Sequence, residues 1–224
     1  TRVSSSRYGR CRPSGDDVAA STTPHDVLIL AGGAARRLGG IDKPAHPLGG
    51  RTLLDRVLDA VYDAQQVVVV GPVRATERPV RWTREQPPGS GPVPALAAGL
   101  ALVGAPLVVV LAADLPFLSA SAVRQLLVPM DNRMDTAMDN VSGAVALDDT
   151  GVYQWLLGCW RAEPLRAAVR DVLGSGAKAS LRAVMTPLAP VAVRVDAGTG
   201  PPPWYDCDTP AELSRAAAWT EGSR

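Results

Sequence analysis

The chain has 224 residues, 46% of them hydrophobic and 20% charged, which is the composition of a globular protein with a core of its own. Its formal net charge of +1 offers no general attraction to nucleic acid, and an aromatic content of 4% argues against base-stacking surfaces. Three cysteines without a C-x-x-C pair exclude a zinc ribbon or disulfide scaffold and favour a reducing cytoplasm. No apolar run approaches the roughly 20 residues of a membrane helix, so we expect neither a nucleic acid nor a membrane partner.

Residues 1–24 are rich in Ser, Arg, Gly and Thr without periodicity, and we interpret them as a disordered tail. The remainder, 25–224, alternates short apolar runs with helical spacing. Strands are expected at 27–31, 67–70, 80–83, 107–111, 141–147, 153–159 and 191–195, and helices at 53–61, 92–102, 119–127, 163–173 and 210–219. This alternation predicts an α/β fold: a single Rossmann-like domain with a mostly parallel central sheet and helices on both faces.

The segment after the first expected strand carries the strongest chemical signal. Residues 31–43 read AGGAARRLGGIDK. Glycines let the backbone approach a ligand, and Arg37 and Lys43 add positive charge, which together suit a polyphosphate. The spacing is neither that of the dinucleotide fingerprint nor that of a Walker loop. A glycine-rich turn with a solvated basic face is the alternative.

Two aspartates follow later elements of the pattern. Asp114 comes directly after the most apolar expected strand, where a carboxylate can hold a divalent cation or serve only as a turn residue before Pro116. Asp208 precedes Thr209 and Pro210 at the start of the last expected helix. Capping alone explains this start, but Asp208 can also complete a metal site with Asp114. Ligands bind at the carboxyl ends of strands in open α/β sheets, so the glycine segment and Asp114 are expected to lie together.

Four stretches taken in order resemble the molybdenum cofactor guanylyltransferase family of nucleotidyltransferases. They are LAGGAARRLGGIDK, PPGSGPVPALAAGL, VVVLAADLPFL and WYDCDTPAEL, and the resemblance runs from about Asp26 to Trp219. The resemblance implies transfer of a nucleoside monophosphate from an NTP to a phosphorylated acceptor. It further implies GTP, molybdopterin and Mg²⁺ as the molecules involved.

The resemblance also implies roles for individual residues. Arg37, Lys43 and Asp114 would be catalytic, and Asp114 and Asp208 would bind Mg²⁺. The nucleotide would contact Leu30, Ala31, Gly32, Gly33, Lys43, Gln86 and Asp114. In the strand at 153–159 and beyond, Arg161, Lys178 and Arg182 could meet the pterin phosphate, or be solvated surface charges.

Two positions depart from the family pattern. Gln86 stands where an acidic residue usually precedes Pro-Pro-Gly; its carbonyl can accept from guanine, but its amide can equally donate to cytosine. Glu85 would face away from it if both lay on a strand. Gly71, at a position that can be Asn, removes another possible contact to the nucleotide. The alternatives are therefore a cytidylyltransferase, transfer to another small phosphorylated metabolite, or a catalytically impaired nucleotide-binding accessory protein.

Overall fold

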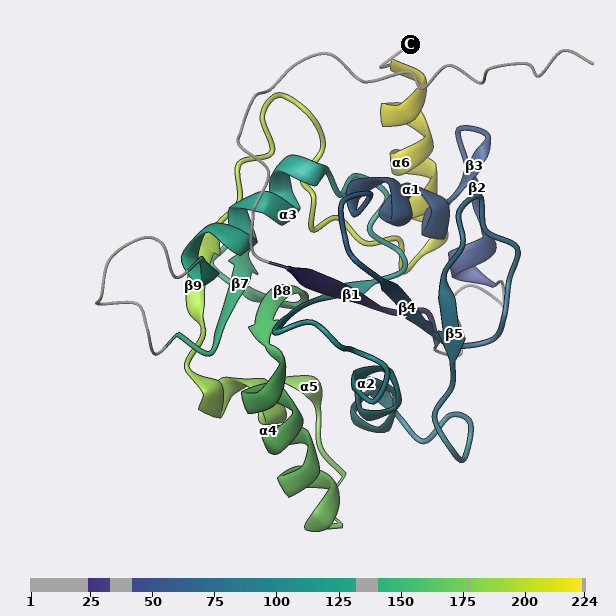
Figure 1. Ribbon diagram of the computed structural model, residues 1–224. Helices are drawn as coiled ribbons and strands as arrows, with labels where there is room; N and C mark the ends of the chain where they lie inside the picture. Colours follow the sequence, from purple (N-terminus) through teal and green to yellow (C-terminus); the bar gives the residue numbers. More distant parts are fainter. Residues whose placement is uncertain (1–23, 33–41, 132–140, 177, 223–224) are drawn as a thin grey trace, which may run out of the picture.

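A computed structural model describes residues 24–32, 42–131, 141–176 and 178–222 of the chain (Figure 1). Residues 1–23 of the tail expected at 1–24, together with Gly33 and Arg37, lie outside the described residues. Within the described part, no helix combines the length and apolar character needed to cross a lipid bilayer.

The core is a seven-stranded sheet with the order β5-β4-β1-β6-β8-β7-β9. The strands are β1 (His25–Leu30), β4 (Val67–Val70), β5 (Arg81–Thr83), β6 (Leu107–Ala112), β7 (Gly143–Leu147), β8 (Tyr153–Arg161) and β9 (Val191–Arg194). Pairing is parallel from β5 to β6 and between β7 and β9, whereas β8 is antiparallel to both β6 and β7. The prediction of a mostly parallel α/β sheet is confirmed.

Helices cover both faces of the sheet (Figure 1). They are α1 (Leu53–Ala60), α2 (Pro92–Leu100), α3 (Ala120–Leu127), α4 (Ala162–Gly174), α5 (Leu181–Met185) and α6 (Pro210–Gly222). Alternate residues of the central strands point to opposite faces, as the pleat requires. Thus Val27 and Ile29 pack with α1 and α3, while Leu28 packs with α2. Because both faces are covered, β4 and β6 are apolar throughout.

Capping side chains explain where several helices begin. The Thr52 hydroxyl accepts from the Asp55 amide at 3.0 Å, and the Ser119 hydroxyl accepts from the Ala122 amide at 3.1 Å. Each satisfies an amide that the first helical turn leaves without a partner. Both starts agree with the sequence-based prediction.

Short elements were not expected from the sequence. They are the hairpin of β2 (Pro47–Leu48) and β3 (Arg51–Thr52), the helix α5, and the 3₁₀ turns η2 (Lys43–Ala45), η3 (Val128–Met130) and η4 (Thr186–Leu188). Two- to five-residue elements are too short to show a hydrophobic period. The hairpin and η2 lie beside α1 and the end of α6, so they belong to the part of the fold that forms the site.

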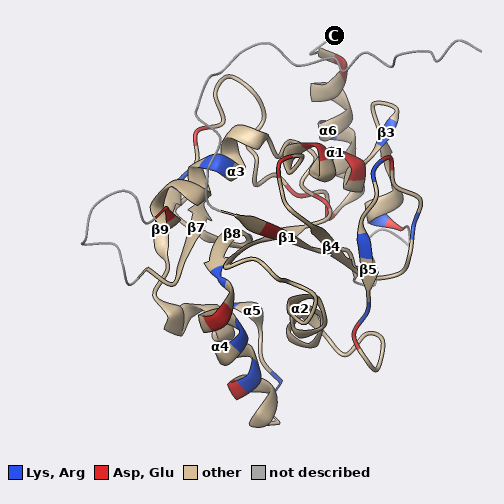
Figure 2. Cartoon of the chain, viewed as in Figure 1, with Lys and Arg blue, Asp and Glu red and all other residues tan. Residues whose placement is uncertain are grey.

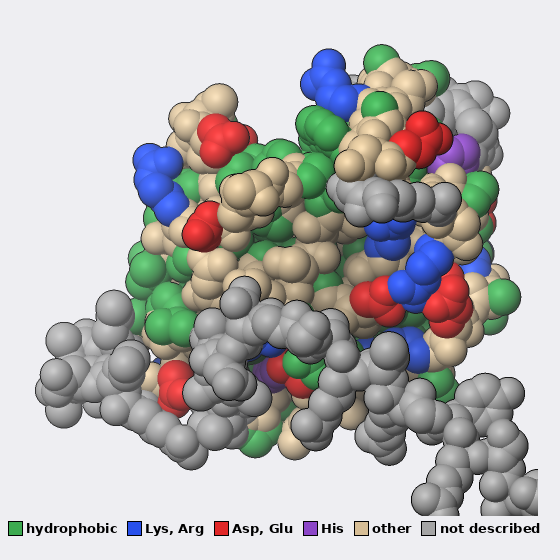
Figure 3. All heavy atoms as spheres, turned by 90° about the horizontal axis from the view of Figure 1, so that it is seen from above, with side chains coloured by type: hydrophobic (Ala, Val, Ile, Leu, Met, Phe, Trp, Pro, Cys, Tyr) green, Lys and Arg blue, Asp and Glu red, His purple; other side chains and the backbone are tan. Residues whose placement is uncertain are grey.

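Charge is distributed unevenly over these elements. The sequence of α2 contains no charged residue, whereas α4 carries both signs (Figure 2). Seen from above, basic and acidic side chains lie next to each other on the face formed by the upper helices (Figure 3). This mixture fits the nearly neutral net charge of the chain.

Candidate active site

The ends of β1 and β6 lie side by side, as the sequence pattern predicts. Leu30 is paired with Ala112, and the Ala113 amide donates to the Leu30 carbonyl at 3.2 Å. On the other side, the Ala31 amide donates to the Val70 carbonyl at 2.8 Å. The start of the glycine segment and the residue preceding Asp114 are therefore fixed by the same ladder of backbone hydrogen bonds.

Lys43 brings two carboxylates together at this edge. Its ammonium lies 2.5 Å from Asp114 Oδ2 and also contacts Asp208 Oδ1. The side chain of Lys43 is 13% exposed, against 20% for Asp114 and 44% for Asp208. Burial lowers the pKa of Lys43, but the attraction and hydrogen bonds of the two carboxylates outweigh it and raise the pKa overall. Lys43 is therefore charged at neutral pH.

Asp208 reaches this point from a loop rather than from a strand. Cys207, next to it, is completely buried with Leu48, Leu53 and Ala216. On the other side, the Glu212 amide donates to the Thr209 hydroxyl at 3.3 Å, and the Thr209 amide donates to the Glu212 carboxylate at 2.7 Å. This is a reciprocal cap of α6, so the predicted capping role of Thr209 is confirmed.

An aromatic cluster holds the Asp208 loop against the loop that follows Asp114. The ring centroids of Phe117 and Tyr205 are 5.9 Å apart, those of Phe117 and Trp219 5.5 Å, and those of Tyr205 and Trp219 4.9 Å. The last two pairs meet edge to face, the arrangement that ring quadrupoles favour. Sequence reasoning missed this cluster, because its members are far apart in the chain and follow no common period.

Asp206 is a further acidic group, which the sequence motifs did not single out. Partial loss of water raises its pKa, and the neighbouring Asp208 and Asp114 carboxylates raise it further. Asp206 thus adds a third carboxylate to the surroundings of Lys43. The described part of the site carries an excess of negative charge that favours an additional cation.

Gly71 keeps the end of β4 close to the glycine segment. A Cβ atom at this position would lie 2.8 Å from the Ala31 carbonyl oxygen, and the φ of 154° also disfavours other residues. Its amide donates to the Thr83 carbonyl at 2.9 Å. The structure thus gives Gly71 a steric role that does not depend on whether a side chain here would touch a nucleotide.

Gln86 lies in an exposed turn after β5, not on a strand. β5 ends at Thr83, and the buried carboxylate of Glu85 accepts a hydrogen bond from the Gly89 amide at 2.7 Å. Neither residue lies on a strand, so the expectation that Glu85 faces away from Gln86 on a strand does not apply. The Glu85 carboxylate is engaged within the turn that presents Gln86.

The three acceptor-side cations do not gather. Arg161 is paired with Leu107, the first residue of β6, whereas Asp114 follows the last residue of β6. The two residues therefore lie at opposite ends of the strands. The Arg161 guanidinium donates to the Val141 carbonyl at 2.9 Å, which is a structural contact. Lys178 lines a pocket of about 340 Å³ between residues 90–94 and the end of α4, and Arg182 is exposed on α5.

A lysine and two carboxylates thus meet at the carboxyl ends of the parallel strands of an α/β sheet. Solved structures agree on the fold. Molybdopterin-guanine dinucleotide biosynthesis protein A from Archaeoglobus fulgidus has a TM-score of 0.65 and 19% identity, over 88% of this chain and 99% of that one. The 2-C-methyl-D-erythritol 4-phosphate cytidylyltransferase from Thermus thermophilus has a TM-score of 0.66 and 22% identity, over 89% and 100%.

Sequence comparison identifies the family. Residues 27–195 match the model of the MobA-like NTP transferase domain, and the chain belongs to this family. It is 33% identical to the molybdenum cofactor guanylyltransferase of Xanthomonas euvesicatoria over 201 residues, which are 86% of this chain and 94% of that protein. With the Bradyrhizobium protein of the same name, the identity is 35% over 118 residues, 48% of this chain and 56% of that protein. The matched family range contains Lys43 and Asp114 but ends before Asp208.

Proposed function

We propose that the protein transfers GMP from GTP to molybdopterin in a reaction that depends on Mg²⁺ and releases pyrophosphate. The observation that carries this proposal is the meeting of Lys43, Asp114 and Asp208 at the tips of β1 and β6. The similarity to proteins named molybdenum cofactor guanylyltransferase supports the choice of nucleotide and acceptor.

The residues present fit a magnesium ion. The carboxylates of Asp114 and Asp208 both contact one ammonium group, so they lie close enough together to bind one cation jointly. Mg²⁺ prefers oxygen ligands and is usually bound by one or two carboxylates together with substrate phosphates and water.

The remaining chemistry requires alignment and charge neutralisation. An oxygen of the acceptor phosphate attacks the α-phosphorus of GTP, and the bond to the leaving pyrophosphate breaks. Phosphate is nucleophilic at neutral pH, so the reaction needs no strong general base. Lys43 and Arg37 would donate hydrogen bonds to the phosphates, and Asp114 and Asp208 would hold the metal. Bound Mg²⁺ would neutralise the charge that develops on the phosphate oxygens.

Gln86 makes transfer of CMP from CTP the second candidate. A glutamine offers both an acceptor and donors, so its position at the turn after β5 suits cytosine as well as guanine. An aspartate at this position can only accept, which favours the N–H groups of guanine. Gln86→Asp is therefore expected to increase the preference for GTP over CTP.

Pyrophosphate release tests the proposal directly. The full chain is incubated with Mg²⁺ and each of GTP, CTP, ATP and UTP, with and without molybdopterin. Release with GTP only when molybdopterin is present supports the proposal, and the same result with CTP supports the second candidate. No release with any pair contradicts both and favours an accessory nucleotide-binding protein.

We further propose a cytoplasmic location, since Cys159 and Cys207 are buried as free thiols.

A further inference from the structure

Asp42, the residue before Lys43, is held by an arginine from another part of the chain. Arg74 lies in the loop after β4. Its Nε atom lies 2.9 and 2.8 Å from the two carboxylate oxygens of Asp42, and its Nη2 atom lies 2.7 Å from Oδ1. The Arg74 side chain is only 12% exposed, and Nη1 also donates to the Pro72 carbonyl at 2.8 Å. Such multiple contacts fix direction as well as distance.

The carboxylate of Asp42 has no other structural task in its own turn. Asp42 occupies the capping position of η2, yet its side chain makes no capping hydrogen bond there. The turn itself is closed by backbone bonds from Ala45 to Asp42 and from His46 to Lys43. Arg74 therefore ties the residue before Lys43 to the loop that follows β4.

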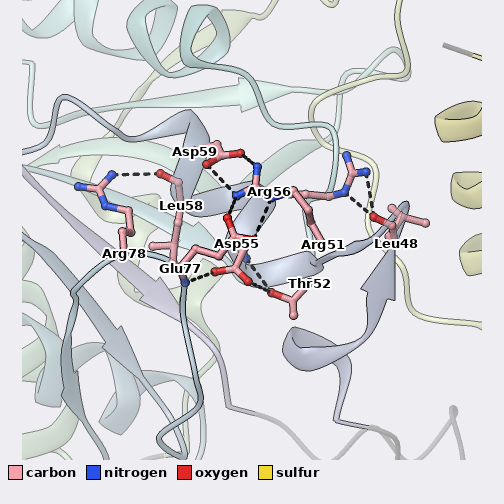
Figure 4. Close-up of polar contacts among 9 residues, drawn as sticks. All are labelled: Leu48, Arg51, Thr52, Asp55, Arg56, Leu58, Asp59, Glu77 and Arg78. Carbon is pink, nitrogen blue, oxygen red and sulfur yellow. Dashed lines mark hydrogen bonds and ion pairs between the residues drawn. The ribbon is translucent and has the colours of Figure 1, made fainter. Parts of the chain in front are cut away.

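The loop that carries Arg74 is itself attached firmly to α1. The Glu77 amide donates to Asp55 Oδ1 at 3.0 Å, and Arg78 donates to the Leu58 carbonyl at 3.2 Å (Figure 4). Arg78 also donates to the Val61 carbonyl at 3.2 Å. Arg51 pairs with the Glu77 carboxylate in the same network. Arg74 thus reaches Asp42 from a rigid support.

We propose that Arg74 is a positioning residue for Lys43. By holding Asp42 it fixes the backbone from which the Lys43 ammonium reaches the Asp114 and Asp208 carboxylates. This inference rests on the proposed function, because it assigns Lys43 to the reacting phosphates. Nothing in the composition of the loop 71–80 indicated such a role.

Arg74→Gln tests the inference in the full-length protein. Because a displacement of about 1 Å in a catalytic group can cost about 100-fold in rate, we expect kcat for GTP-dependent pyrophosphate release to fall between about 10- and 100-fold. The KM for GTP should change much less. Arg74→Lys should recover part of the rate, because one contact to Asp42 can re-form but the forked geometry cannot.

Arg166→Gln is the matched control. Arg166 is also a partly buried arginine, pairing with Glu163 and donating to the carbonyls of Leu100 and Val103 on the opposite face of the sheet. The Arg166→Gln substitution should lower the melting temperature without lowering kcat. An equal loss of kcat in both variants would mean that Arg74 acts through stability alone, and would overturn the inference.

A double-mutant cycle with Asp42→Asn completes the test. If Arg74 acts through Asp42, the double variant loses no more rate than either single variant. If the rate loss of the double variant equals the product of the two single losses, the inference is overturned. If the wild-type protein releases pyrophosphate and Arg74→Gln is equally active, the inference about Arg74 is overturned but the proposed function is not. A wild-type protein inactive with every NTP overturns the proposed function and this inference with it.

Discussion

Asp114 and Asp208 contact the same ammonium group, but different forces hold them there. Asp114 follows a central strand and is placed by backbone hydrogen bonds between β6 and β1. Asp208 lies on a loop near the end of the chain and is placed by side chains, chiefly the cluster of Phe117, Tyr205 and Trp219. Backbone pairing is little affected by a change of side chain, whereas an aromatic cluster depends on each member. The Asp208 side of the site is therefore the more easily displaced.

The largest effect is expected at Asp114. Asp114→Ala should lower GTP-dependent turnover by about 10³-fold, the upper range for loss of one charge-stabilising group. The fold should survive, because the carboxylate is partly exposed and the strand before it is unchanged. Circular dichroism and the melting temperature provide the control. Turnover close to wild type would contradict the role assigned to Asp114.

Lys43→Ala removes the group that both carboxylates share. We expect turnover to fall by about 10²-fold, because the variant lacks the ammonium group proposed to face the phosphates. Replacing the exposed Arg170 on α4 by alanine removes a charge of the same sign far from this edge and should leave turnover unchanged. If both variants behaved alike, the effect would reflect net charge and not position.

Asp208→Asn should lower turnover less than Asp114→Ala, by about tenfold, since an amide oxygen remains able to bind a cation weakly. Raising the Mg²⁺ concentration should restore part of the rate. A loss as large as that of Asp114→Ala would show that the two carboxylates are equivalent, and the difference between the two sides would disappear.

Trp219→Ala tests whether side-chain packing places Asp208. Removing a partly buried aromatic residue should lower the free energy of unfolding by about 2 kcal/mol. Turnover should fall a few-fold, and the Mg²⁺ concentration needed for half-maximal rate should rise, as with Asp208→Asn. Urea denaturation and a Mg²⁺ titration measure the two effects. A loss of stability with an unchanged Mg²⁺ dependence would show that the aromatic cluster stabilises the fold but does not position Asp208.

The smallest effect is expected from Thr209→Ala. Loss of the α6 cap should lower the free energy of unfolding by about 1 kcal/mol, the usual value for such a cap. Turnover should remain near wild type because Cys207 and the aromatic rings still hold the loop. A marked fall in turnover would show that the cap, rather than the cluster, fixes Asp208.

The sequence predicted the elements with a clear hydrophobic period and the junctions with a clear chemical signal. Every long strand was found, and the rule that ligands meet at strand ends brought Lys43 and Asp114 together. The contact between Arg74 and Asp42 could not be predicted, since it joins two loops whose paths depend on the packed fold. The position of Lys43 between two carboxylates also required the structure. The roles of these residues in catalysis remain predictions.

The position of α6 has a consequence for incomplete copies of this protein. The last helix supplies Trp219 and covers Cys207, yet it contributes no strand to the sheet. A product interrupted just before Pro210 by a stop codon or a protease would retain all seven strands, but Leu48, Leu53 and Cys207 would lose the helix that covers them. Such a product should unfold more easily than the 224-residue chain and would lack a firmly held Asp208.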